Sequence, residues 1–264
     1  MCIRIPKTAD NVREKTDLFL ERKRKIMTKV TVRAAHTANE FEHHNLVHLC
    51  GKLVSKKRIK RDTLLVVISC GSRRERKDKD GKIIRDIIRV TFYDDAADAY
   101  DKRFETGDFV TISGISQLVR DHYNGTSAVA IWGITMGPKY VGGHMIPDHN
   151  QVNILGKIES AAVITKNYIL INVKTTVQKE RKYLGESNVI SSINQTYTSV
   201  TPIGIRCAGD ASQVIKQFTP GTYINSSGYV DTKKMDIDET HTHIVNRIIS
   251  TRLEIVGDIQ PVKQ

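Results

Sequence analysis

The sequence predicts an all-β protein with two similar β-barrels in tandem, preceded by a basic extension that suits a short helix. Strand-like alternation of apolar and polar residues begins near Asn45, and the same pattern returns 105 residues later. Glycines and polar turn residues recur at matching places in both copies. A chain of 264 residues is long enough to bury two cores of ordinary domain size.

Two anchors define the repeat. Segment 45–53 has Asn, Val, Leu, Gly and Leu at alternate positions, and segment 150–158 has Asn, Val, Ile, Gly and Ile at the same spacing. The element from Gly107 to Gly114 returns as Gly221 to Gly228, 114 residues later. The offset grows by nine residues between the anchors. We therefore expect an insertion in the second copy, in the polar segment 186–201, because loops accommodate added length at low cost.

The order of elements in each copy indicates an OB-fold. Each copy reads as strand, strand, basic or polar loop, strand, short helix near Ala97 or Ala211, strand, hairpin and strand, the order of this five-stranded Greek-key barrel. Asn124-Gly125 predicts the turn of the first hairpin. The expected organisation is a basic extension over 1–40, a first barrel over 41–137, a linker over 138–149 and a second barrel over 150–260.

Positive charge is concentrated in two stretches. The chain has 41 basic and 29 acidic residues, and segments 52–89 and 1–34 carry net charges of +9 and +6. Such clusters indicate a polyanionic partner, with a solvated surface as the alternative. Within the extension, 10–30 suits a helix with a weak apolar face and has no strand pattern, so it is either a basic arm or a mobile tail.

The remaining composition excludes several classes of protein. The four cysteines lie far apart with no C-x-x-C pair, which argues against a zinc ribbon and a secreted disulfide framework. No apolar run reaches the length of a membrane span, and no secretory signal is evident. We expect an intracellular protein with no membrane partner, in the cytoplasm or nucleoid, or in a host cytoplasm if it is viral.

Catalytic motifs are missing from the sequence. Asp94-Asp95 suits the cap of a helix better than a metal site, and His241 and His243 have no evident third ligand. The sequence has no phosphate-binding loop, dinucleotide fingerprint or nucleophile elbow. We expect no enzymatic activity, no cofactor and no metal ion.

Three segments resemble the single-stranded DNA-binding (SSB) family of bacteria and phages: Asn45-Leu-Val-His-Leu-Cys-Gly51, Arg89-Val-Thr-Phe-Tyr-Asp-Asp-Ala-Ala97 and Gly107-Asp-Phe-Val-Thr-Ile-Ser-Gly114. The resemblance covers 42–137 and, more weakly, 150–258. It implies a non-enzymatic protein that coats or protects single-stranded DNA in replication, recombination or transfer. Cellular members end in a Gly-rich tail with an acidic tip, whereas this chain ends in Gln260-Pro-Val-Lys-Gln264, which suggests a phage- or plasmid-like member.

The resemblance also assigns aromatic positions. In the family an aromatic residue ends the third strand and stacks a base; Tyr93 matches that position, with packing in the core as the alternative. Cys207 stands there in the second copy, which implies weaker DNA binding or a role in assembly. Tyr123 matches an aromatic residue near the tip of the last hairpin, to within about two residues. Trp132 is expected to pack in the core or between the barrels.

The expected contacts with nucleic acid combine a basic groove with aromatic faces in the first copy. The residues predicted to make them are Lys56, Lys57, Arg58, Lys60, Arg73, Arg74, Arg76, Lys77, Lys79, Lys82, Arg89, Tyr93, Arg120 and Tyr123. Two other functions stay open: an OB protein that binds RNA, and a structural or primosome-like module that mainly binds proteins. Two barrels in one chain also suggest a homo-oligomer or a filament on DNA.

Overall fold

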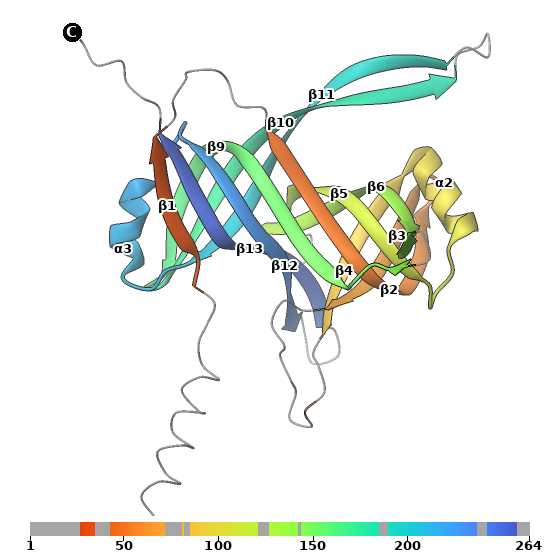
Figure 1. The fold of residues 1–264 in the computed structure, drawn as a ribbon, viewed down its shortest axis with the longest axis horizontal. Coiled ribbons are helices and arrows are strands. Elements are labelled where there is room, and N and C mark those ends of the chain that lie inside the picture. The colour runs from red at the N-terminus through yellow and green to blue at the C-terminus, as the bar shows by residue number, and fades with distance from the viewer. Residues whose placement is uncertain are drawn as a thin grey trace, which may run out of the picture.

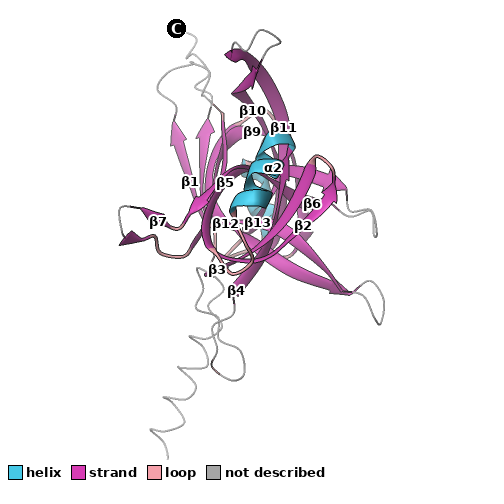
Figure 2. Ribbon diagram, turned by 90° about the vertical axis from the view of Figure 1, so that its right-hand side faces the viewer, coloured by secondary structure: helices cyan, strands magenta, loops and turns pink. Residues whose placement is uncertain are grey.

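The computed structural model describes residues 27–34, 43–71, 81, 85–120, 127–141, 144–184, 190–236 and 242–257. Strands make up most of this part of the chain, and Figure 2 shows only short helices among them. The strands form two barrels side by side, with helices α2 and α3 at opposite ends of the molecule (Figure 1). The expected all-β architecture is confirmed.

The first barrel has five strands and one helix. Antiparallel pairs join its strands in the order β5-β2-β3-β4, and β6 pairs with β5 on one side and with β4, in parallel, on the other, so the sheet closes. The helix lies between the third and fourth strands, as the OB-fold requires. The elements are β2 (His44–Lys60), β3 (Thr63–Gly71), β4 (Arg85–Tyr93), α2 (Asp94–Arg103), β5 (Phe109–Arg120) and β6 (Ser127–Pro138).

The second barrel repeats these pairings. Its parallel closure joins Gly204 to Ile249, as the first barrel joins Thr91 to Trp132. Its elements are β9 (His149–Thr165), β10 (Tyr168–Leu184), β11 (Ile190–Arg206), α3 (Ala211–Val214), the 3₁₀ turn η1 (Ile215–Gln217), β12 (Tyr223–Asp236) and β13 (Thr242–Gly257). Between the barrels, β7 (Tyr140–Val141) and β8 (His144–Met145) form a small separate sheet. None of the described helices is long and apolar enough to cross a membrane.

The two barrels are joined through their first strands. Strand β2 pairs antiparallel with β9, and Val47 lies opposite Val152. These two valines occupy the same position in the two copies of the repeat, so a pseudo-two-fold axis passes between them. Through this pair the described strands, apart from β7 and β8, form one continuous sheet. The barrels therefore meet as two halves of a symmetric unit, with Val47 and Val152 both buried at the junction.

The recurring glycines have specific structural reasons. A bulge interrupts the pairing at Gly114 in β5 and at Gly228 in β12, and a Cβ at either position would clash with a backbone carbonyl of the neighbouring strand. Gly107 and Gly221 have φ values of +107° and +88°, a region that side chains disfavour. The sequence repeat thus marks the same two backbone features in both barrels.

The insertion in the second copy lengthens a hairpin and does not form the polar loop expected over 186–201. The first barrel leaves β3 at Gly71 and resumes at Arg85, whereas β10 continues to Leu184 and β11 starts at Ile190. The β10–β11 pair is continuous over 17 residues in each strand and projects from the barrel (Figure 1). Because the added residues pair with one another, the backbone groups that the two strands turn toward each other are satisfied within the hairpin.

The N-terminal extension contains a strand, which the sequence pattern did not indicate. Strand β1 (Lys29–Ala34) pairs in parallel with β13, with Lys29 opposite Arg252. Thr28, which is buried, anchors its start: its backbone N–H donates to the Arg206 carbonyl (2.9 Å), and its hydroxyl donates to the Ser250 carbonyl (2.6 Å). The strand is only six residues long and needs the exposed edge of β13, so no local pattern reveals it. Residues 10–26 of the expected helix lie outside the described residues.

Deletion of residues 1–34 should destabilise the protein. The deletion removes β1 and the buried hydrogen bonds of Thr28, each worth about 0.5 to 1.5 kcal/mol, so the free energy of unfolding should fall by about 2 to 4 kcal/mol. Thermal or urea unfolding of a chain that begins at Met27 provides the control, because that chain keeps both features. Identical unfolding of the two shortened chains would show that β1 is not part of the fold.

Candidate nucleic-acid interface

Strand β4 presents a regular outer face. Ile88, Val90 and Phe92 point into the core and are fully buried, so the residues between them face outward. At the end of the strand Tyr93 is 41% exposed. Its ring is therefore a surface group and not a core residue. Burial of its inner part, reinforced by Asp62, raises the pKa of Tyr93, so its hydroxyl is uncharged at neutral pH and does not repel an anion.

Tyr93 forms an aromatic pair with Trp132. The two ring centroids lie 5.7 Å apart in an edge-to-face arrangement with planes inclined by 76°. Trp132 comes from β6 and lies opposite Thr91 of β4, at the seam that closes the barrel. Trp132 is half-buried beside the exposed Tyr93 and is not one of the fully buried core residues. The sequence predicts a place for Trp132 in the core or between the barrels, because the two rings come together only when the barrel closes and brings distant segments into contact.

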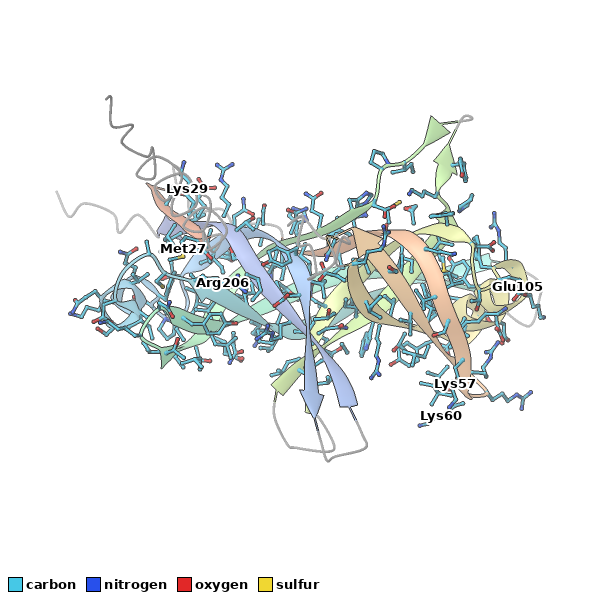
Figure 3. The ribbon with its side chains drawn as sticks, turned by 90° about the horizontal axis from the view of Figure 1, so that it is seen from below. Met27, Lys29, Lys57, Lys60, Glu105 and Arg206 are labelled. Atoms are coloured by element: carbon cyan, nitrogen blue, oxygen red, sulfur yellow. The ribbon has the colours of Figure 1, made fainter. Side chains whose placement is uncertain are left out.

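Two exposed lysines lie beside this pair. Lys60 is opposite Thr63 across β2 and β3, and Thr63 is opposite Tyr93 across β3 and β4, so the three residues are neighbours on adjacent strands. Lys57 is also exposed, opposite Leu65 on the same pair of strands, and Figure 3 shows it at the same end of the molecule as Lys60. This end of the barrel therefore combines positive charge with an exposed aromatic ring.

Lys56 and Arg58 are held by helix α2. The Lys56 ammonium donates to the Asp101 carbonyl (2.6 Å) and to Glu105 (3.1 Å). The Arg58 guanidinium pairs with Asp98 (2.8 Å) and Asp101 (2.9 Å). These bonds fix the helix against β2 and offset both positive charges.

The remaining predicted contacts are placed only in part. Arg89 is half-buried on the outer face of β4. The backbone of Arg120 belongs to β5, but its side chain lies outside the described residues. Also outside them are Arg73, Arg74, Arg76, Lys77, Lys79 and Lys82, in the loop from β3 to β4, and Tyr123, in the loop from β5 to β6.

The linker carboxylate Asp148 is anchored at the base of the basic loop. Arg85, the first residue of β4, donates to the Ser69 hydroxyl (2.9 Å) and to Asp148, and the buried Lys139 also donates to Asp148. Burial by itself would raise the pKa of Asp148, but the bonds from Lys139 and Arg85 outweigh it and hold that pKa below its usual value. No local pattern predicts this group, because Ser69, Arg85 and Asp148 come from three separate segments of the chain.

The second barrel has no aromatic pair at the matching position. Tyr168 lies opposite Arg206, as Thr63 lies opposite Tyr93, so the counterpart of Tyr93 is Arg206 and not Cys207. Cys207 is one residue further along and is buried, with its N–H bonded to the Asn167 carbonyl (2.9 Å). The second copy has one more residue than the first between the end of this strand and the helix, that is, between β11 and α3. The alignment of Ala97 with Ala211 therefore placed Cys207, and not Arg206, at the position of Tyr93. The counterpart of Trp132 is Ile249, which is also buried.

Comparisons with known proteins identify the fold. No protein-family model and no curated protein sequence matches the chain. The wild-type single-stranded DNA-binding protein from Thermus aquaticus is similar in structure, with 14% identity, a TM-score of 0.51 and coverage of 85% of this chain and 98% of that one. A deletion mutant of that protein gives 14% identity, a TM-score of 0.51 and coverage of 84% and 99%. The chain shares the fold of this OB-type protein. The likeness extends over both barrels, as the coverage shows.

Proposed function

We propose that the protein binds single-stranded DNA and has no enzymatic activity. The observation that carries the proposal is the exposed Tyr93 ring, paired with the half-buried Trp132 on the outer face of the first barrel, next to Lys57 and Lys60. OB barrels bind oligonucleotides on the face of their second and third strands, between the loops that join the first two strands and the last two. In this chain that face is formed by β3 and β4, where Tyr93 lies.

The chemistry of the face favours an unpaired strand over a duplex. A base can stack on an exposed ring only when its own face is free, and each such stack is worth about 1 to 3 kcal/mol whatever the base. Lysines at the edge of the face supply the attraction to phosphates, which does not depend on sequence. A role in coating or protecting single strands during replication, recombination or transfer fits this combination.

The charged residues divide into two groups in this proposal. Lys57, Lys60 and the loop of residues 72–84 contact phosphates. Lys56 and Arg58 are already paired with helix α2, so their main contribution is to hold that helix on the barrel. The aromatic pair determines the preference for single strands, and the free lysines determine the salt dependence.

The salt dependence of binding should separate these groups. Each phosphate contact to a single strand contributes about 0.7 to the slope of log K against log salt. Replacement of both Lys57 and Lys60 by Ala should therefore lower the slope by about 1.4. The slope is measured with oligo-dT at salt concentrations between about 50 and 300 mM. A variant with Lys102→Ala and Lys216→Ala, two lysines on helices away from the face, should keep the original slope. If both double variants behave like the unmodified protein, the lysine-rich end of β2 does not contact the strand.

A further inference from the structure

The second barrel carries a charged cluster where the first barrel carries its aromatic pair. Arg206 occupies the position of Tyr93, and Arg247 and Asp231 lie beside it. Ile203 and Ile205 point into the core, so Arg206 projects from the outer face of β11. The side chain of Arg206 is 20% exposed and that of Arg247 is 39% exposed.

The cluster holds more positive than negative charge. The Arg247 guanidinium lies 2.6 Å from a carboxylate oxygen of Asp231, which is a short ion pair. The Arg206 guanidinium lies 4.0 Å from the same oxygen, at the outer limit of an ion pair. Because Arg247 already compensates the buried Asp231, the N–H groups of Arg206 can turn to an added anion without leaving the carboxylate unpaired.

The backbone of Arg206 is fixed on both sides by the N-terminal segment. Its carbonyl accepts from the Thr28 N–H (2.9 Å), and its N–H donates to the Thr28 hydroxyl (3.1 Å). Met27 and Lys29 therefore lie at the same end of the molecule as Arg206, away from Lys57 and Lys60 (Figure 3). The start of β1 thus positions Arg206 and adds the exposed Lys29 to the same end.

Tyr168 occupies the strip of the outer face beside Arg206, and it is half-buried there. A Cβ built on Gly204, the outward residue before Arg206, would clash with the hydroxyl of Tyr168. The Tyr168 side chain thus covers the strip of β11 that corresponds to Thr91 in the first barrel, and Ile249 is buried where Trp132 is half-buried. At the position of Tyr93 the face therefore offers the Arg206 guanidinium, with the half-buried Tyr168 packed beside it.

We propose that the second barrel binds a phosphate of the nucleic-acid strand through Arg206, at the position where the first barrel stacks a base on Tyr93. The inference rests on the proposed binding of single strands and assigns different tasks to the two barrels. A guanidinium presents several donors in a planar fork that matches phosphate oxygens. The first barrel then recognises unpaired bases, and the second recognises the backbone.

Two probes of equal length test this assignment, oligo-dT and an abasic strand that keeps only sugar and phosphate. Arg206→Gln should lower the salt slope by about 0.7 with both probes, and Arg206→Lys should restore it. Tyr93→Ala should leave the slope unchanged and reduce the preference for oligo-dT over the abasic strand. Lys216→Gln, an exposed lysine of the same barrel, is the control and should match the unmodified protein. An unchanged slope in Arg206→Gln would overturn the assignment of Arg206. If Tyr93→Ala in addition bound both probes like the unmodified protein, the proposed function would be overturned too.

Chemical protection of the unmodified protein gives a second test that does not depend on the folding of a variant. Phenylglyoxal modifies accessible guanidinium groups, and its products are located by peptide mass analysis. Saturating oligo-dT should slow the modification of Arg206 several-fold and leave Arg103, exposed on α2, unaffected. Equal modification of Arg206 with and without the strand would contradict the proposal.

Discussion

Tyr93→Ala should weaken the binding of oligo-dT by about 1 to 3 kcal/mol, which corresponds to a loss of affinity of roughly 5- to 150-fold. The ring is 41% exposed and touches Trp132 at its edge, so its removal takes away a stacking surface without opening a core cavity. The loss should be similar for every base, because each base has a π-face. The salt slope should not change, because no phosphate contact is lost.

The matched control is Tyr140→Ala. Tyr140 is 53% exposed in strand β7 of the linker, away from the face of β3 and β4, and its removal should leave affinity unchanged. Thermal unfolding of both variants should resemble that of the unmodified protein. A large fall in the melting temperature of Tyr93→Ala would instead assign the ring a structural role, and unchanged affinity at unchanged stability would move the binding surface elsewhere.

Asn45→Ala should lower the free energy of unfolding by about 3 kcal/mol or more. The buried Asn45 amide pairs with the backbone of Ser116: its oxygen accepts from the Ser116 N–H (3.0 Å) and its nitrogen donates to the Ser116 carbonyl (2.7 Å). The same nitrogen lies 3.0 Å from the hydroxyl of Ser199 in the second barrel. Each buried partner left without a hydrogen bond costs about 1 to 3 kcal/mol.

Urea unfolding measures this loss, with Asn172→Ala as the control. Asn172 bonds to the Ser160 hydroxyl (2.9 Å) in an exposed position, so its replacement should cost about 0.5 kcal/mol or less. Asn150→Ala should behave like Asn45→Ala, because Asn150 makes the same pair of bonds to the backbone of Val230 (2.7 and 2.9 Å). Equal stability of Asn45→Ala and the unmodified protein would show that this network does not hold the junction together.

The fold was largely accessible from the sequence because its repeat reflects backbone geometry. Asn45 and Asn150 recur because the side-chain amide of each bonds to the backbone of the neighbouring strand where the backbone pairing ends. Gly114 and Gly228 recur because a Cβ there would clash with the next strand. Strand β1 was missed because its pairing depends on the distant edge of β13. Local patterns predict elements, but an edge strand that needs a partner more than 200 residues away has no local signal.

The candidate site was accessible only in part, for the same reason. Tyr93 was assigned by the family resemblance, in which an aromatic residue ends the third strand, and Lys57 and Lys60 by the density of positive charge. The contact between Tyr93 and Trp132 depends on barrel closure. The pairing of Arg58 with Asp98 and Asp101 depends on how helix α2 lies over β2. The alignment of the copies also failed by one residue at Arg206, because a single added residue after a strand leaves no mark on the repeat.

Titration of fluorescent oligo-dT against a duplex of the same length tests the central claim most directly. A face that works by stacking unpaired bases should bind the single strand at least about fivefold more tightly than the duplex at the same salt concentration, since a single stack is worth about 1 to 3 kcal/mol. The difference should shrink in Tyr93→Ala. Equal affinity for the two probes, with both lost as salt rises, would mean that the protein binds polyanions through charge alone, and would contradict the account.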